Sequence, residues 1–482
     1  AYKRSPFLAV VIHRATSFVR FFLFWRVVME YEEFLQRKAH VGAEFGISSY
    51  TIRDELFEYQ KHVAAKAIKK GRYACFLDTG LGKTIIELTI AQNYAESANK
   101  RVLIITPLAV AFQFIKEAEK FGINDVTYCK DGVLKSKIII CNYDRLHYFN
   151  ADDFDCVILD ESSILKNFDG ATKSAITEFM KKIKYRYLFT ATPSPNDYIE
   201  LGTSSEALGY MGYMDMLSRF FKNNSGSIDI RHSGEEWYLK AHAENNFWQW
   251  VSTWSLSMKK PSDIGFSDDG FLLPNLIERE TIVKNNSPLV VNNQHSLFNK
   301  QAQNFFELKA EVRSTVNDRC ETAVKSLNDA EIGVYWVNLN DEAKVIKSID
   351  KNAVEISGAM DIDKKEELLI AFANSEISRL VTKTSITAFG LNWQHCNRMA
   401  YFPTFSFEQY YQAVRRLWRF GQKRDVFVDL ILSDGQAKVM NSLIAKKEKA
   451  QNMFEKLVGQ VNSNYTSNIA KFDKKIQLPS FI

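Results

Sequence analysis

The chain has 482 residues, of which 46% are hydrophobic and 25% charged, so it can bury large cores and is long enough for roughly three domains. This composition excludes a disordered or fibrous protein. The net charge of +5 and the pI near 8.6 suit an anionic partner, but they fall short of the strongly basic balance that by itself indicates nucleic-acid binding.

The apolar segment at residues 7–28 is interrupted by ionisable side chains well before the ~18 to 20 apolar residues that a membrane span requires. These side chains are His13, Arg14, Arg20 and Arg26. The segment also lacks the small-residue cleavage site of a signal peptide. Because Met29 begins an acidic-led helical pattern, we interpret residues 1–28 as a non-native or optional extension. The alternative is an amphipathic helix that docks on the protein or on a membrane surface.

Residues 52–205 alternate short, continuous apolar runs with amphipathic helical stretches, a pattern that predicts a parallel sheet with helices on both faces. The first domain is expected over residues 29–205. The expected strands are 73–77, 101–106, 137–141, 156–160 and 185–190.

The same alternation returns in residues 300–482, after a helix expected at 300–327, and the chain ends in a further helix. The expected strands here are 332–337, 379–383, 398–403 and 426–432. Between the two sheets, residues 206–299 carry four of the eight tryptophans, and we expect a mainly helical insertion there. Phe247, Trp250 and Trp254 would share one helix face, which favours a buried stripe over a base-stacking platform.

The six cysteines show no C-x-x-C pair, and several lie inside apolar runs. This pattern predicts reduced, buried side chains in a cytosolic protein, with neither a zinc knuckle nor a disulfide framework. The cysteines are Cys75, Cys129, Cys141, Cys156, Cys320 and Cys396.

The stretch "FLDTGLGKTIIEL" (76–88) follows an expected strand and opens an expected helix. Glycines at 80 and 82 let backbone N–H groups converge on phosphate oxygens at a helix N-terminus. Lys83 would reach the β- and γ-phosphates, and Thr84 would ligate Mg²⁺. Only Leu77 departs from the strict pattern, which has glycine there. The expected phosphate-binding residues are Thr79, Gly80, Leu81, Gly82, Lys83 and Thr84.

Two further segments carry charged side chains to the ends of the expected sheets. Asp160 and Glu161 end a buried strand, where Asp160 would hold Mg²⁺ and Glu161 would polarise the attacking water; alone, such a pair is usually a solvated strand end. Arg416 and Arg419 lie three residues apart on an expected helix and could reach a γ-phosphate across a cleft. The alternative is a solvated basic helix or one that contacts nucleic-acid phosphates.

In this order, the segments resemble superfamily 2 helicases and translocases, particularly the SWI/SNF-type ATPases and their phage or prophage relatives. The resemblance runs over residues 56–432, from "LFEYQ" (56–60) through "LDTGLGKT", "LDESSILKN" and "LFTATPSPND" to "QAVRRLWRFGQ" (412–422). It implies two RecA-like P-loop domains that bind ATP and Mg²⁺ and a DNA partner. It also assigns adenine reading to Gln60, coupling or nucleic-acid contact to Pro107, Thr190, Thr192, Ser385, Gly390 and Asn392, and a catalytic role to Gln412 beside Arg416 and Arg419.

The chain also departs from this family. Ser162 and Ser163 replace an Ala-His pair, and Arg415 and Trp418 stand where SWI/SNF-type enzymes typically carry acidic and histidine residues. We therefore expect the two domains to be coupled through different residues than in SWI/SNF-type enzymes. No chromodomain, bromodomain or nuclease signature is visible, so the sequence gives no support for a nucleosome substrate.

Together these patterns predict an ATP-dependent DNA motor that follows the phosphate backbone, with duplex DNA favoured and single strands or RNA as alternatives. A strand-separating helicase is the second hypothesis. A nucleotide-gated binding module with vestigial hydrolysis is the third. The expected location is the cytoplasm, or the bacterial host cytoplasm or nucleoid if the protein is phage-encoded, without a membrane partner.

Overall fold

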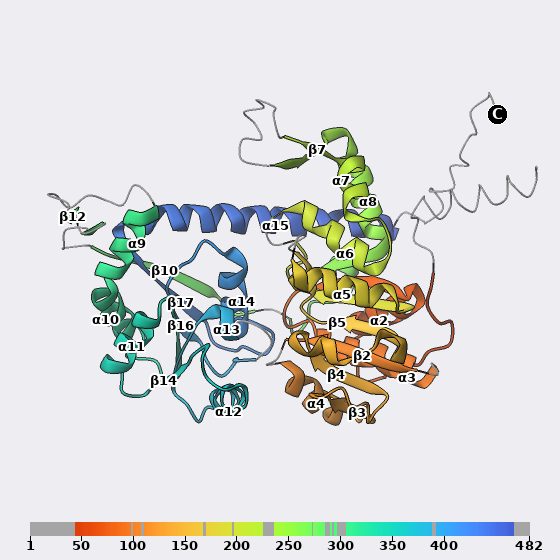
Figure 1. Cartoon of the computed structure of the whole chain (residues 1–482), viewed down its shortest axis with the longest axis horizontal. Coiled ribbons are helices and arrows are strands. Elements are labelled where there is room, and N and C mark those ends of the chain that lie inside the picture. The colour runs from red at the N-terminus through yellow and green to blue at the C-terminus, as the bar shows by residue number, and fades with distance from the viewer. Residues whose placement is uncertain are drawn as a thin grey trace, which may run out of the picture. The chain divides into compact units, whose positions relative to one another are not determined.

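The computed structural model describes residues 44–466 apart from a few short segments (Figure 1). Those segments are 98–99, 108–109, 167–169, 195–196, 225–235, 272, 285–289, 292–293, 296–304 and 388–391. The extension expected at residues 1–28 lies outside the described part. None of the helices searched in that part is long and apolar enough to cross a bilayer.

The first domain, residues 45–258, contains a parallel sheet with the strand order β3-β4-β2-β5-β6-β1-β9. Its strands are β1 (Arg72–Leu77), β2 (Arg101–Thr106), β3 (Val126–Tyr128), β4 (Ile138–Asn142), β5 (Phe154–Leu159), β6 (Tyr185–Thr190) and β9 (Ser255–Met258). Successive residues of β1 face opposite cores, since Phe76 belongs to one apolar cluster and Cys75 to the other. The continuous apolar runs of the sequence therefore mark strands buried on both faces, as predicted.

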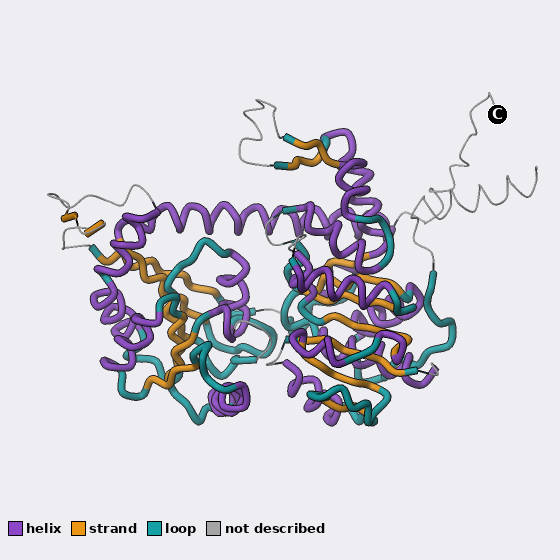
Figure 2. Tube along the Cα trace, viewed as in Figure 1, coloured by secondary structure: helices purple, strands orange, loops and turns teal. Residues whose placement is uncertain are grey.

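Helices cover both faces of this sheet, and Figure 2 shows the strands lying between them. Val63, Ile86 and Phe114 of α2, α3 and α4 pack into one core, whereas Ile176 and Met216 of α5 and α7 pack into the other. The helices are α2 (Glu58–Lys70), α3 (Lys83–Ser97), α4 (Ala111–Lys120), α5 (Ala171–Lys181), α6 (Leu201–Leu208), α7 (Tyr213–Phe220) and α8 (Glu244–Trp254).

Residues 206–299, the segment expected as an insertion, contribute a strand to each of the two sheets. Strand β9 pairs with β1 and extends the first sheet. A short antiparallel pair, β7 (Phe221–Asn223) with β8 (Trp237–Leu239), precedes α8 in the chain. Further along, β10 (Leu276–Val283) pairs with the second sheet instead. The buried stripe is confirmed, because Phe247 and Trp254 are 0% exposed and Trp250 is 7% exposed.

The second domain contains a parallel sheet with the strand order β10-β17-β16-β13-β15-β14. Its further strands are β13 (Gly333–Trp336), β14 (Ala353–Ile356), β15 (Arg379–Thr382), β16 (Arg398–Tyr401) and β17 (Val426–Ser433). Its helices are α9 (Phe305–Ser314), α10 (Val316–Ser326), α11 (Asn340–Ile349), α12 (Ile362–Ala373), α13 (Thr384–Thr387) and α14 (Phe407–Leu417). The single helix expected at 300–327 is thus two helices that meet at Thr315.

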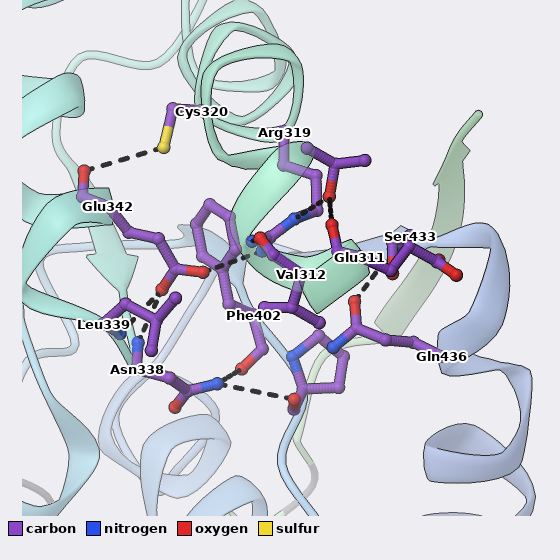
Figure 3. Close-up of polar contacts among 12 residues, drawn as sticks. Glu311, Val312, Arg319, Cys320, Asn338, Leu339, Glu342, Phe402, Ser433 and Gln436 are labelled. Carbon is purple, nitrogen blue, oxygen red and sulfur yellow. Dashed lines mark hydrogen bonds and ion pairs between the residues drawn. The ribbon is translucent and has the colours of Figure 1, made fainter. Parts of the chain in front are cut away.

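A buried ion pair anchors α10 to α11 in this domain (Figure 3). Arg319 Nη1 lies 2.8 Å from Glu342 Oε1, and both side chains are 1% exposed. Glu342 Oε2 also accepts hydrogen bonds from the backbone N–H groups of Asn338 and Leu339, each at 2.9 Å. Because a buried charge is tolerated only when its polar atoms are satisfied, this network holds the loop that follows β13 in place.

The long helix α15 (Ala437–Thr466) contributes to the cores of both domains. Met440 and Leu443 pack into the second domain, whereas Met453 and Leu457 pack into the first. A single continuous helix therefore joins the two sheets in addition to the connecting segment.

Candidate active site

The phosphate loop joins β1 to α3, and Lys83 is the first residue of that helix. Gly80 and Gly82 have φ values of +91° and +74°, in the region that favours glycine. A Cβ on Gly82 would also lie 2.2 Å from Gln60 Nε2. Both glycines are therefore required by the backbone path, and the loop has the form that presents N–H groups to an anion.

Gln60 holds this loop from α2. Its Oε1 accepts from the Phe57 backbone N–H at 3.1 Å, and its Nε2 donates to the Leu81 carbonyl at 3.3 Å. The Tyr59 hydroxyl donates to the same carbonyl at 2.9 Å. The residue predicted to read a base thus also fixes the loop that would hold the phosphates.

Asp160 and Glu161 follow β5 at the edge of the sheet where ligands bind. The Thr106 hydroxyl donates to Asp160 Oδ2 at 2.9 Å, and the Thr190 hydroxyl donates to Glu161 Oε2 at 3.4 Å. Burial, together with the charge of Glu161, raises the pKa of Asp160 to about 7, against the opposing charge of Lys83. Glu161 has φ +52°, an uncommon backbone conformation for glutamate, so local strain is concentrated at the residue predicted to activate water.

The second domain supplies basic side chains from α14 and from the turn after it. Gln412 and Arg416 lie on α14, but the helix ends at Leu417, so Arg419 lies beyond it. The two arginines therefore do not share a helix face, which corrects the prediction, although both are buried against the same cavity. Burial and the charge of Arg415 lower the pKa of Arg419 to about 10, whereas the charge of Glu161 opposes this shift.

These groups line one cavity of about 350 Å³ between the domains. The predicted residues in its lining are Gln60, Thr79, Gly80, Gly82, Lys83, Thr84, Asp160, Glu161, Asn392, Gln412, Arg416 and Arg419. Among the described residues, the buried atoms Gln412 Nε2, Arg419 Nε and Asn392 Oδ1 have no hydrogen-bond partner. Gln412 Nε2 and Arg419 Nε are donors, so these two unsatisfied atoms fit a polyanionic ligand such as a nucleoside triphosphate in the cavity that the glycines also line.

Other predicted site residues lie outside this lining. Leu81 contributes its carbonyl to Tyr59 and Gln60, and its side chain is buried. The Pro107 carbonyl accepts from the Val110 N–H at 2.9 Å. Thr190 accepts from the Thr192 N–H at 3.0 Å, and Ser385 is exposed on α13. Gly390 lies outside the described residues.

An aromatic wall of the cavity is absent from the predicted set. Phe271, in the segment connecting the domains, stacks on Phe420 with ring centroids 4.8 Å apart. It also meets the rings of Phe57 and Tyr59, each at 5.3 Å. Phe57 lies close to Gln60 in the chain and Phe420 lies inside the "RFGQ" stretch, so the sequence could have indicated both as cavity residues. Phe271 lies in a loop without a periodic pattern, so nothing in the sequence indicated its position.

Comparison with known families identifies both halves of this site. Residues 53–195 match the model of the type III restriction enzyme res subunit, and residues 319–421 match the helicase conserved C-terminal domain. The two domains are thus similar to superfamily 2 helicase-like ATPase domains, and each of them contains a parallel sheet.

Three curated relatives match parts of the chain. A SWI/SNF-related chromatin regulator, subfamily A-like protein 1, from Xenopus tropicalis is 29% identical over 150 residues, covering 29% of this chain and 16% of the relative. The DNA annealing helicase and endonuclease ZRANB3 from Mus musculus is 29% identical over 175 residues, covering 33% of this chain and 16% of the relative. The DNA excision repair protein ERCC-6-like from Bos taurus is 30% identical over 178 residues, covering 31% of this chain and 14% of the relative. The matched region thus spans only about a sixth of the length of these relatives.

Among solved structures, the Sulfolobus solfataricus SWI2/SNF2 ATPase core in complex with dsDNA is 17% identical, with a TM-score of 0.39. The match covers 85% of this chain and 98% of that chain.

Proposed function

We propose that this protein is an ATP-dependent motor that moves along duplex DNA. The observation that carries the proposal is the cavity between the domains, where Lys83 and Glu161 of the first domain face Arg419 of the second. A site assembled from both domains makes nucleotide turnover depend on how the domains are arranged. Repeated turnover can therefore drive repeated opening and closing.

In this site the phosphate loop and Lys83 hold the β- and γ-phosphates of ATP. Thr84 and Asp160 hold Mg²⁺, which neutralises phosphate charge when bound. Glu161, held by Thr190, polarises the attacking water. Arg416 and Arg419 stabilise the charge that develops on the transferred phosphoryl group from the opposite side.

The track is DNA, contacted mainly through its phosphates. The named relatives include a DNA annealing helicase and a DNA excision repair protein, and the net charge of +5 suits a polyanion. The proposed coupling or nucleic-acid-contact residues are Pro107, Thr190, Thr192, Ser385, Gly390 and Asn392. We place the protein in the cytoplasm. The relatives named above are vertebrate proteins, so the phage or prophage kinship inferred from the sequence stays a prediction.

ATPase rates with no nucleic acid, single-stranded DNA, duplex DNA, forked DNA and RNA test this function. We expect the largest stimulation with duplex DNA, and the Glu161→Gln variant is the control for contaminating activity. Stimulation only by single strands or RNA would favour the strand-separating helicase. Nucleotide binding without turnover on any of these substrates would favour the nucleotide-gated binding module.

Strand separation is measured separately. The buried tryptophans of α8 leave no aromatic wedge on that helix. Opening duplex DNA disrupts base stacking, which contributes about 1.4 kcal/mol per base-pair step. We therefore expect the protein to displace the third strand of a DNA triplex in the presence of ATP while a simple fork stays largely paired. Efficient fork unwinding would contradict this expectation.

A further inference from the structure

Arg415 joins the second domain to the phosphate loop. Its Nη2 lies 2.9 Å from Asp78 Oδ2 and donates to the Thr79 carbonyl at 2.9 Å, and its Nε donates to the Thr79 hydroxyl. The Arg415 side chain is 6% exposed and that of Asp78 is 16% exposed. Charge-assisted contacts of this kind, shielded from water, are stronger than neutral hydrogen bonds.

Asp78 is held by two side chains of the same helix. One of its carboxylate oxygens accepts from the Tyr411 hydroxyl and, at 2.6 Å, from the Thr79 N–H. The other faces Arg415. Since Tyr411 and Arg415 are one turn apart on α14, both contact the start of the loop from a single helix face.

The same arginine is linked to the segment that connects the domains. Its guanidinium lies over the Trp418 ring, 5.1 Å from the centroid, and Trp418 Nε1 donates to the Pro274 carbonyl at 2.7 Å. Arg415 and Trp418 are the two positions of this stretch that differ from the SWI/SNF-type pattern. Both differences therefore fall in one chain of contacts, from the phosphate loop through α14 to the connecting segment.

We propose that Arg415 is a positioning residue that sets where Arg416 and Arg419 stand relative to the nucleotide phosphates. It is bonded to the loop that holds those phosphates and directly precedes Arg416 in the chain, so its placement carries both arginines toward the cavity. This inference rests on the proposed ATPase function and names a residue that acts through others.

The test compares Arg415→Gln, Asp78→Asn and the double variant by steady-state ATPase kinetics with saturating duplex DNA. Misplacing a catalytic group by 1 Å can cost about 10²-fold, so we expect each single variant to lower kcat by roughly 10- to 100-fold, with KM for ATP changed by less than about 3-fold. Because the two residues act as one unit, the double variant should be no worse than the more impaired single variant. Arg415→Lys keeps the charge but loses the planar guanidinium group, so its kcat should lie between those of wild type and Arg415→Gln.

A second cross-domain ion pair supplies the matched control. Lys166, after the Asp160-Glu161 pair, contacts Glu408 of α14, and the Glu408 side chain is 8% exposed. Lys166→Gln removes a link between the same two domains without touching the phosphate loop. Its kcat should stay within about 3-fold of wild type, and thermal unfolding should show that all variants are folded.

The outcomes separate the two levels of the proposal. If wild-type protein hydrolyses no ATP with any nucleic acid, the proposed function fails and this inference fails with it. If wild type is active and Arg415→Gln matches it, only the inference is overturned. Equal losses in Arg415→Gln and Lys166→Gln would also overturn it, because general tethering of the domains would then explain both.

Discussion

Phe420 of the second domain lies directly against Gly80 of the phosphate loop. A Cβ built on Gly80 would lie 2.8 Å from Phe420 Cβ and 2.9 Å from the Phe420 backbone nitrogen. Since real Cβ atoms do not approach backbone so closely, glycine at this position allows the two domains to close over the cavity.

Gly80→Ala should therefore disturb both the loop and the contact between the domains. The φ of +91° adds backbone strain of roughly 1 to 3 kcal/mol for alanine. We expect at least a ~10-fold loss in kcat/KM for ATP. Gly122→Ala is the matched control, because Gly122 has φ +61° but nothing within 4 Å of an added Cβ. If both variants lose activity equally, backbone strain alone accounts for the effect.

Lys83 and Glu161 should separate binding from hydrolysis. Lys83→Ala removes the cation of the phosphate loop, so we expect weaker ATP binding and no turnover. Glu161→Gln keeps the shape of the side chain but removes its charge, so ATP should bind and stay uncleaved. Fluorescent-nucleotide titration and phosphate release measure the two steps. Wild-type turnover in both variants would refute the site assignment.

Arg419→Ala should lower kcat by ~10³-fold or more, the scale of a lost arginine finger, while ATP affinity changes much less. Arg424→Ala is the control within the same segment, because its guanidinium is exposed and donates to the His395 carbonyl. Should Arg419→Ala weaken only DNA binding and leave DNA-free turnover intact, Arg419 would instead be a backbone contact.

Trp250→Ala should act on stability. Trp250 is 7% exposed and packs against Trp254 with ring centroids 5.4 Å apart, inside the core of the first domain. Truncating a buried tryptophan costs about 3 to 5 kcal/mol, which chemical denaturation would detect. A folded, fully stable Trp250→Ala protein with a specific defect in fork unwinding would show instead that this ring acts on DNA.

Glu87→Gln should stabilise the protein increasingly as pH rises. Glu87 is 0% exposed, and neither carboxylate oxygen has a hydrogen-bond partner among the described residues. Burial, and then the charge of Asp160, raises the pKa of Glu87 well above its ordinary value of 4.5. The folded protein therefore holds a proton that the unfolded chain releases above about pH 4.5, so wild-type stability falls as pH increases beyond that value.

Urea denaturation at pH 5, 6, 7 and 8 measures this effect. The difference between Glu87→Gln and wild type should widen across the series, and Glu96→Gln, on the exposed side of the same helix, is the matched control for the exchange of glutamate by glutamine. A constant difference for Glu87→Gln would contradict the prediction.

Much of the fold was predictable because its signals are local. The continuous apolar runs located nine strands to within about two residues, since strands buried on both faces need no polar alternation. Four strands of the two sheets were missed, namely β3, β9, β14 and the largely exposed β10. Strand β9 is only four residues long and alternates serine with Leu256 and Met258, and β10 has charged residues at its centre, so the pairing of each strand with its neighbour identifies it.

The sequence by itself determined the chemistry of the site: a glycine-rich loop ending in Lys83 and Thr84, and a carboxylate pair at a strand end. Within each of these two groups the residues lie close together in the chain, so local spacing predicts the chemistry of each group. Only the tertiary structure decided that Arg415 grips Asp78, that Phe271 stacks on Phe420, and that Arg419 lies beyond its helix. The first two contacts join residues far apart in the chain, and the third depends on where α14 stops. The two contacts follow from how the two domains pack, which no local pattern encodes.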